Sequence, residues 1–225
     1  MNWDKDYEKD KMIWGEQPSE LAVFTAGYLE KSGLAESSFS LIDLGCGYGR
    51  DAAYLCGKFN CNILGLDKAA EAIRMAQSKM KGTTSVQFQC TDFFGVERPG
   101  LYDFVYASNL YQLFKPEERL NFRELARKLL KPQGYLLLST HSASDPEHAG
   151  KGRPVPGDTN SFIDQKYVHL CDEAELRRDF SFLDIQVLLE HRYDEPRSTG
   201  EVHHHISWML AGQVITPVKV NCREK

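Results

Sequence analysis

The segment that most constrains the fold is a short apolar run followed directly by three glycines, LIDLGCGYGR at residues 41–50. Such a run is typical of a buried strand, and the glycines let the backbone turn sharply and approach a ligand closely. A helix beginning just after the glycines would point its free N–H groups at that ligand. The segment therefore predicts a strand, a ligand-binding loop and a helix in direct succession.

The same alternation continues along the chain. Further strands are expected at residues 61–66, 85–90, 102–107 and 135–139, and helices at residues 50–58, 69–81, 116–130 and 172–180. Strands separated by helices favour right-handed crossovers and a parallel sheet. Two strands with no helix between them, at residues 182–191 and 202–211, predict a C-terminal β-hairpin. We therefore expect an α/β fold, with a doubly wound, mostly parallel seven-stranded sheet and an antiparallel C-terminal hairpin strand.

The 225 residues show no break in composition, which predicts one domain. Residues 1–33 are expected to form an N-terminal helical arm, with one helix at residues 4–13 and a second at residues 19–31. Ser19 is a plausible N-cap of the second helix, and Gly33 lies just beyond its end.

Charge and cysteine usage narrow the function classes. The net charge is −5 and no Lys/Arg-rich block occurs, which counts against a nucleic-acid partner. No apolar run approaches the roughly 18 residues of a membrane span. Six scattered cysteines without a CxxC pair or a signal peptide favour reduced thiols. We expect a soluble cytoplasmic protein, and its oligomeric state is left open.

Asp43 discriminates between possible ligands of the glycine loop. Residues 47–52 also fit the dinucleotide pattern GxGxxA, with Asp67 about 20 residues on, so NAD is a real alternative to be weighed. A carboxylate beside a pyrophosphate is repelled. Beside an ammonium or sulfonium it is attracted, by about 4 kcal/mol at 4 Å and an effective dielectric constant near 20, before desolvation is subtracted. A cationic, amino-acid-bearing ligand is favoured over NAD, and over a glycine turn that serves only packing.

The run DLGCGYG at residues 43–49 resembles the first motif of class I S-adenosylmethionine-dependent methyltransferases, D/E-x-G-x-G-x-G. The resemblance covers residues 38–140, the expected cofactor-binding core, and implies S-adenosylmethionine as cofactor. It implies that Asp67 accepts both ribose hydroxyls, the alternative being a helix-capping role. Asp92 and Phe93 resemble the pair that binds adenine, the alternative being an Asx turn. The runs YDFVYASNL at residues 102–110 and KPQGY at residues 131–135 resemble later motifs.

The cofactor site implied by this resemblance comprises Trp14, Asp43, Gly45, Cys46, Gly47, Gly49, Arg50, Asp67, Lys68, Thr91, Asp92, Phe93, Ser108 and Asn109. A looser resemblance, carried by the N-terminal arm and residues 175–180, is to the tellurite-resistance and thiopurine-type small-molecule methyltransferases.

Acceptor-side residues are expected after the fourth and fifth strands, because open α/β sheets bind ligands beyond the carboxyl ends of their strands. Tyr111 and His141 are the catalytic candidates there; Tyr111 could equally be a core aromatic, and His141 a plain loop histidine. The Asn/Asp-Pro-Pro-Tyr motif of DNA adenine methyltransferases does not occur in this region. Residues 142–165 are expected to form a lid over the acceptor, because three prolines and three glycines fall within residues 142–160.

Three consecutive histidines, at residues 203–205, lie on the last expected strand. His203 and His205 would share one face and His204 the other, so at most two could join one site. No cysteine pair lies nearby, and no metal site is predicted. Contact with the acceptor is a second possibility, and a polar strand exposed to solvent is favoured.

The favoured function is methyl transfer from S-adenosylmethionine to a small-molecule acceptor by in-line displacement. Methylation of RNA or protein is the alternative within the same class. A cofactor-binding protein without transferase activity, or an NAD-dependent oxidoreductase, is the alternative outside it.

Overall fold

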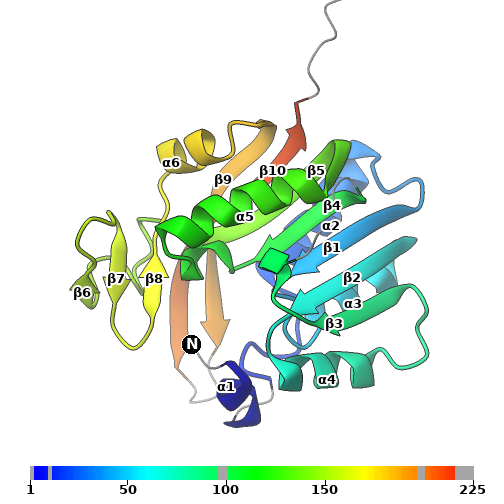
Figure 1. Cartoon of the computed structure of the whole chain (residues 1–225), viewed down its shortest axis with the longest axis horizontal. Helices are drawn as coiled ribbons and strands as arrows, with labels where there is room; N and C mark the ends of the chain where they lie inside the picture. The colour runs from blue at the N-terminus through cyan, green and yellow to red at the C-terminus, as the bar shows by residue number, and fades with distance from the viewer. Residues whose placement is uncertain (1–2, 10–11, 96–100, 197–200, 216–225) are drawn as a thin grey trace, which may run out of the picture.

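The computed structural model describes residues 3–9, 12–95, 101–196 and 201–215, and Figure 1 shows helices on both faces of one large sheet. Its elements are α1 (Trp3–Lys9), α2 (Glu20–Ser32), β1 (Phe39–Leu44), α3 (Arg50–Lys58), β2 (Cys61–Asp67), α4 (Ala70–Lys79), β3 (Val86–Cys90), the 3-10 turn η1 (Phe93–Gly95), β4 (Tyr102–Ser108), the 3-10 turn η2 (Tyr111–Leu113), α5 (Pro116–Leu129), β5 (Leu130–His141), β6 (Arg153–Pro154), β7 (Ser161–Ile163), β8 (Tyr167–His169), α6 (Glu173–Asp179), β9 (Leu183–Pro196) and β10 (Val202–Val214).

Seven strands form one sheet in the order β3-β2-β1-β4-β5-β10-β9. The pairs from β3 to β5 are parallel, whereas β10 lies antiparallel between β5 and β9. The predicted doubly wound sheet with an antiparallel C-terminal strand is confirmed. The chain winds outward in opposite directions from β1 and β4, so the switch point lies between these two strands. Open α/β sheets bind ligands at the carboxyl ends of such strands.

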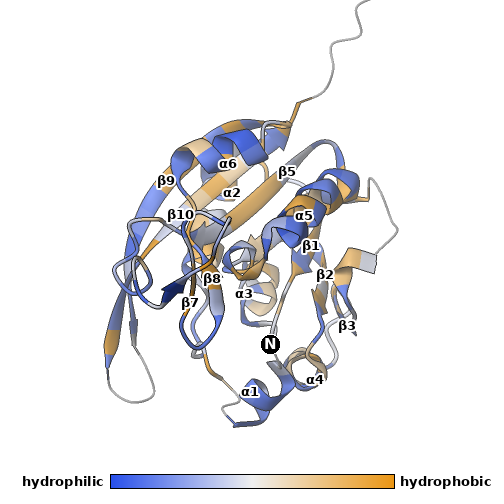
Figure 2. Cartoon of the chain, turned by 60° about the vertical axis from the view of Figure 1, so that its left-hand side comes forward, coloured by the Kyte–Doolittle hydropathy of each residue, from blue (hydrophilic) through white to orange (hydrophobic). Residues whose placement is uncertain are grey.

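Two apolar layers hold the helices against the sheet. Helices α2, α3 and α4 cover one face, through buried side chains such as Leu29, Leu55 and Ile73. Helices α5 and α6 cover the other, through buried side chains such as Phe122 and Leu176. Figure 2 shows hydrophobic residues concentrated on the central strands and hydrophilic residues on α6 and along β9 at the sheet edge.

The ends of the first long helix follow from its sequence. Ser19 caps α2, and its Oγ accepts a hydrogen bond from the Ala22 N–H. Gly33 follows α2 in the left-handed conformation, with φ 70°. Both predicted ends of this helix are confirmed. Residues 10–11, part of the predicted first helix, lie outside the described residues, and α1 ends at Lys9.

The long connection after β5 is more ordered than the sequence suggests. We call residues 142–171 the insert; it contains a small antiparallel sheet in the order β6-β7-β8. Arg119 of α5 anchors this sheet, since its guanidinium lies 2.7 Å from the Asp158 carboxylate and donates to the Tyr167 hydroxyl at 2.8 Å. Short strands of two or three residues carry too weak a periodicity to be recognised in sequence.

Five cysteines within the described ranges are free thiols; Cys222 lies outside those ranges. Among the described helices, none is long and apolar enough to cross a membrane.

Candidate functional site

The glycine loop, residues 45–49, joins β1 to α3 at the switch point. Gly45, Gly47 and Gly49 all have positive φ, at 74°, 52° and 72°. A Cβ on Gly47 would lie 3.0 Å from the Tyr7 hydroxyl, and a Cβ on Gly49 would lie 2.7 Å from the ring of Phe88. These positions therefore require glycine for both their backbone conformation and the space around them.

Asp67 at the end of β2 holds the loop in place. Its Oδ2 accepts a hydrogen bond from the Gly47 N–H, and its Oδ1 accepts one from the Ala69 N–H, both at 2.9 Å. The second bond forms an Asx turn ahead of α4, whose N-cap is Ala69, so Asp67 does not take the helix-capping role that the sequence left open. Each carboxylate oxygen can accept more than one hydrogen bond, so capacity for ribose hydroxyls remains.

Asp43 is the most unusual charge at this end of the sheet. It is 3% exposed, and no hydrogen bond from the described residues influences its carboxylate. Burial, and then repulsion by Asp51 and Asp67, raises its pKa well above the usual range. Burial, and then repulsion by all three of these acids, Asp43 first, also raises the pKa of the Cys46 thiol. A buried carboxylate without a partner, beside two further acids, suits a ligand that brings a positive charge.

A second network at this end was not predicted. The Asp51 carboxylate accepts hydrogen bonds from the Ser19 N–H at 2.7 Å, the Ser19 hydroxyl at 2.6 Å and the Tyr106 hydroxyl at 2.8 Å. The Ser108 hydroxyl also donates to Ser19 Oγ at 3.1 Å. This network ties α2 and β4 to the start of α3. An acid in the first turn of a helix was a signal in the sequence, but its partners lie 32 and 55 residues away in the chain.

The N-terminal arm lies against the glycine loop. Tyr7 of α1 is buried and meets the Tyr48 ring edge-on, with 6.0 Å between ring centroids. The Tyr48 hydroxyl donates to the Gly15 carbonyl at 2.6 Å. Arg50 donates to the carbonyl of Trp14, so these two predicted cofactor residues contact each other. The arm therefore covers the loop that the sequence assigned to the cofactor.

The predicted cofactor residues that follow β2 and β3 fall into two groups. Asp92 and Lys68 are exposed, and Asp92 Oδ1 accepts a hydrogen bond from the Phe94 N–H at 3.0 Å, which is an Asx turn. Phe93 is only 7% exposed, and its ring packs against those of Phe94 and Phe114. The ring of Phe93 therefore packs in the core, and its contact with adenine stays a prediction. The Thr91 N–H bonds the backbone at the end of β2.

We call the carboxyl ends of β4 and β5 the acceptor edge. Asn109 lies there in the left-handed conformation, with φ 49°. Its N–H donates to Ser139 Oγ at 3.0 Å, and its side-chain oxygen accepts from the same hydroxyl at 3.2 Å. Asn109 also bonds the Tyr193 hydroxyl of β9. Three strands are therefore joined by side chains at this edge.

Tyr111 does not reach the acceptor edge, which corrects one catalytic expectation. Its side chain is fully buried among Phe114, Phe122 and Phe180. Its hydroxyl donates to Asp179 Oδ2 at 2.8 Å. The residue is a core aromatic whose polar end is satisfied, the second of the two interpretations that the sequence allowed.

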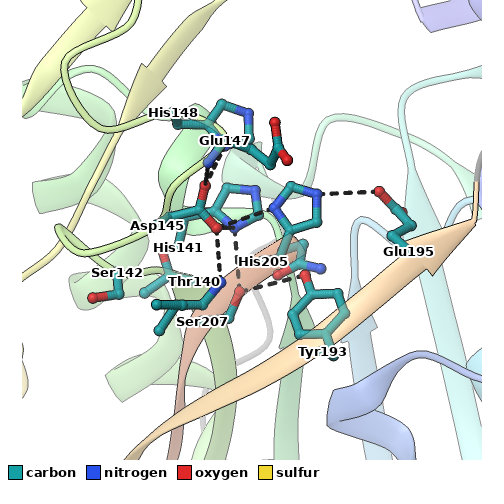
Figure 3. Close-up of polar contacts among 12 residues, drawn as sticks. Thr140, His141, Ser142, Asp145, Glu147, His148, Tyr193, Glu195, His205 and Ser207 are labelled. Atoms are coloured by element: carbon teal, nitrogen blue, oxygen red, sulfur yellow. Dashed lines mark hydrogen bonds and ion pairs between the residues drawn. The ribbon is translucent and has the colours of Figure 1, made fainter. Parts of the chain in front are cut away.

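His141 lies at the end of β5 within a group of side chains that we call the histidine cluster: His141, Asp145, His148 and His205. Figure 3 shows their rings gathered around the Asp145 carboxylate. Burial, and then the neighbouring His148, lowers the pKa of His141 to about 3. A base of that strength accepts protons poorly near neutral pH, so the structure does not favour His141 as a general base.

The three consecutive histidines behave differently from one another. His204 is exposed and bonds Asp194 at 2.6 Å, as expected for a polar strand. His205 faces the other way, is 3% exposed, and lies 3.0 Å from Asp145. The alternation was predicted correctly, but the exposure of His205 was not. The expectation failed because the insert covers this face of β10.

Comparisons with known proteins agree with this geometry. A sequence profile described as "Methyltransferase domain" matches residues 41–134, from β1 to the turn within β5. The chain is 22% identical over 138 residues to a phosphoethanolamine N-methyltransferase of Plasmodium falciparum, a match that covers 56% of this chain and 52% of that protein. The chain thus spans about half the length of this curated relative.

Two solved structures show the same fold. The N-methyltransferase NodS of Bradyrhizobium japonicum, in complex with S-adenosyl-L-homocysteine, superposes with a TM-score of 0.68 at 13% identity, covering 96% of this chain and 100% of NodS. TehB of Haemophilus influenzae superposes with a TM-score of 0.64 at 16% identity, covering 84% of this chain and 62% of TehB. At these identities the likeness concerns the fold.

Proposed function

We propose that this chain, which belongs to the class I S-adenosylmethionine-dependent methyltransferase superfamily, transfers a methyl group from S-adenosylmethionine to a small-molecule acceptor. The buried Asp43 carboxylate, which has no donor or cation among the described residues, carries this proposal. The ammonium and sulfonium groups of the cofactor supply the missing positive charge. A pyrophosphate would add negative charge beside three acids.

Each region of the site has a distinct task in this proposal. Asp67 and the glycine loop bind the ribose and the amino-acid part of the cofactor, while the exposed Asp92 remains available to the adenine amine. When bound, S-adenosylmethionine supplies an activated methyl group. The protein then has to hold the nucleophile in line and exclude water. Ser108 and Asn109, at the acceptor edge, are placed to orient the acceptor.

Two covering segments favour a small acceptor over RNA or protein. Lys166, between β7 and β8, bonds Asp6 of α1 at 2.8 Å, and its ammonium lies 4.4 Å from the centre of the Trp3 ring. The insert and the N-terminal arm therefore meet. We propose that residues 142–165 cover the acceptor. Because Arg119 anchors Asp158 and Asp145 is fully buried, we expect a preformed cover and not a freely hinged lid.

A ligand comparison tests the cofactor. S-adenosylhomocysteine should raise the melting temperature and bind in calorimetry, and NAD should do neither. Tight NAD binding would overturn the methyltransferase assignment. The acceptor class is tested by the release of S-adenosylhomocysteine in the presence of small amines, thiols and phosphorylated amino alcohols, with RNA and protein extracts as the competing substrates.

Hydrogen exchange tests the cover. A preformed cover predicts slow exchange at residues 158–171 in the free protein and little change when S-adenosylhomocysteine binds. Fast exchange that slows only when acceptor is added would restore the hinged lid.

A further inference from the structure

The histidine cluster brings together side chains from three separate parts of the chain. His141 ends β5, Asp145 and His148 belong to the insert, and His205 lies on β10. One ligand atom from each of the four lies within 4.8 Å of every other. The rings are nearly parallel, with centroids 4.7 Å apart for His141 and His148 and 5.1 Å apart for His141 and His205.

His205 occupies a position that a neutral imidazole cannot satisfy. Its Nδ1 lies 3.0 Å from Asp145 Oδ2, and its Nε2 lies 3.3 Å from Glu195 Oε2. A neutral imidazole has one N–H and can donate to only one of these carboxylates. The other nitrogen then directs a lone pair at an anion, unless a second proton or a metal ion lies between them.

The neighbouring histidines bring two more nitrogens to the same carboxylate. His148 Nδ1 lies 2.9 Å from Asp145 Oδ1, and His141 Nδ1 lies 4.0 Å from Asp145 Oδ2. Without an ion, a doubly protonated His205 donates to both carboxylates, His148 donates to Asp145, and His141 Nδ1 lies 3.2 Å from the Ser207 hydroxyl. An ion among the three Nδ1 atoms would replace these hydrogen bonds by metal bonds. Zinc–nitrogen bonds of about 2.0–2.1 Å in a tetrahedron place the ligand atoms roughly 3.4 Å apart. The observed distances from the histidine Nδ1 atoms to the Asp145 oxygens lie on both sides of that value.

The surroundings are those of metal-bound histidine. A ligating imidazole usually donates its other N–H to a carboxylate, as His205 Nε2 is placed to do toward Glu195. The Asp145 carboxylate is oriented by the backbone N–H groups of Glu147 at 3.0 Å and Ile206 at 2.8 Å. Asp145 is fully buried and His205 nearly so, which excludes competing water.

A second group of possible ligands provides a useful contrast. His169, Cys171 and Glu175 also lie within reach of one another. There the Arg119 guanidinium, 3.9 Å from Glu175, already supplies a positive charge, and the two nitrogens of His169 bond the Ser161 hydroxyl and Glu175. His141 Nδ1 also lies 3.2 Å from a hydroxyl, that of Ser207, so the contrast between the two groups lies in the guanidinium: the ion pairs of Asp145 within the described residues are with histidines.

We propose that His141, Asp145, His148 and His205 bind one divalent first-row transition-metal ion, with zinc as the reference ion. Three imidazoles and one carboxylate match the ligand preference of such ions. Four protein ligands complete a tetrahedron and leave no open position, which is typical of structural sites. The ion joins the insert to β5 and β10 beside the acceptor edge. This site is independent of the methyl-transfer proposal.

Zinc titration of the chelator-treated full chain, without a histidine tag, tests the site. We expect one zinc ion per chain by mass spectrometry and a zinc-dependent rise in melting temperature. His148→Gln, at the half-buried ligand, should weaken zinc binding by more than about a hundredfold, because even the loss of an outer partner costs roughly 10–100-fold. Glu195→Gln, at that outer partner, should fall within this smaller range.

His204→Gln is the matched control, because it changes the adjacent histidine that faces solvent. It should bind zinc like the wild type. Cobalt substitution gives a readout that does not depend on any variant folding: intense visible bands of four-coordinate cobalt support the site. A weak six-coordinate spectrum, or equal zinc affinity for the wild type and His148→Gln, would overturn it.

Discussion

The glycine loop and the histidine cluster each have a buried carboxylate, but the surroundings of the two carboxylates are opposite. Asp43 beside the glycine loop has no donor among the described residues, and burial with neighbouring acids raises its pKa. Asp145 in the histidine cluster is buried too, yet hydrogen bonds from His148 and His205 outweigh burial and lower its pKa. One region leaves a charge for a ligand to neutralise. The other surrounds its charge with nitrogens from the chain.

The largest expected effect tests whether the stability contributed by the insert is independent of cofactor binding. Arg119→Met leaves Asp158 buried without its cation, which should lower the free energy of unfolding by about 3–5 kcal/mol. The affinity for S-adenosylhomocysteine should stay within about twofold, since the cofactor residues lie elsewhere. Urea unfolding and calorimetry measure the two quantities.

Arg177→Met is the control for this change, because Arg177 pairs with Glu173 on the exposed side of α6 and should contribute under about 1 kcal/mol. Parallel losses of stability and cofactor affinity in Arg119→Met would show that the two regions act as one unit.

The second prediction isolates the cofactor end. Asp67→Ala would remove the two charge-assisted hydrogen bonds that we propose to the ribose, each worth roughly 1.5–3 kcal/mol, together with the bond to the Gly47 N–H. With partial replacement by water, the affinity for S-adenosylhomocysteine should fall about a hundredfold. Asp103→Ala, at the opposite end of the sheet, should leave that affinity unchanged. A change under threefold in Asp67→Ala would limit Asp67 to its hydrogen bonds with the backbone.

The third prediction uses pH to test Asp43. Its pKa is raised in the folded state, so the folded protein holds a proton that the unfolded chain releases. Stability attributable to Asp43 is therefore lost as pH rises from about 4 toward the folded pKa. Without ligand, Asp43→Asn should be more stable than the wild type, with a gap that widens from pH 5 to pH 7.5.

The same variant should bind S-adenosylhomocysteine about tenfold more weakly, which is about 1.4 kcal/mol. A gap that narrows with rising pH would contradict the raised pKa, and unchanged affinity would contradict contact with the cofactor ammonium.

The smallest expected effect concerns the contact between the N-terminal arm and the insert. Lys166→Ala removes an exposed ion pair with Asp6 and the contact with the Trp3 ring, so unfolding should change by under about 1 kcal/mol. Release of S-adenosylhomocysteine, followed by stopped flow, should quicken by about twofold to threefold because the arm moves more freely. Lys151→Ala, which breaks an ion pair within the insert, should leave release unchanged. Equal release rates for Lys166→Ala and the wild type would separate the arm from the cofactor.

The sequence predicted the cofactor half of the molecule well for a local reason. The strand, the glycines and the helix at residues 39–58 are contiguous in the chain, so the residues that contact one another there are also close in sequence. The hydrogen-bond partners of Asp51 and His205 come from distant segments of the chain, and no local pattern in the sequence predicts them. The direction of the Tyr111 side chain could not be predicted either, because an aromatic residue after a strand can face the core or the site.

The β-bulge between Ala211 and Gly212 shapes how this chain can tolerate change in length. A strand has two faces, so inserting one residue before His205 would exchange the places of His204 and His205, whereas inserting two would restore them. Downstream, the bulge already absorbs an extra residue on β9, and Gly212 allows Leu183 to pack close by. Among related chains we therefore expect length variation within β10 ahead of the histidines to come in even steps, and to be free of that parity beyond the bulge.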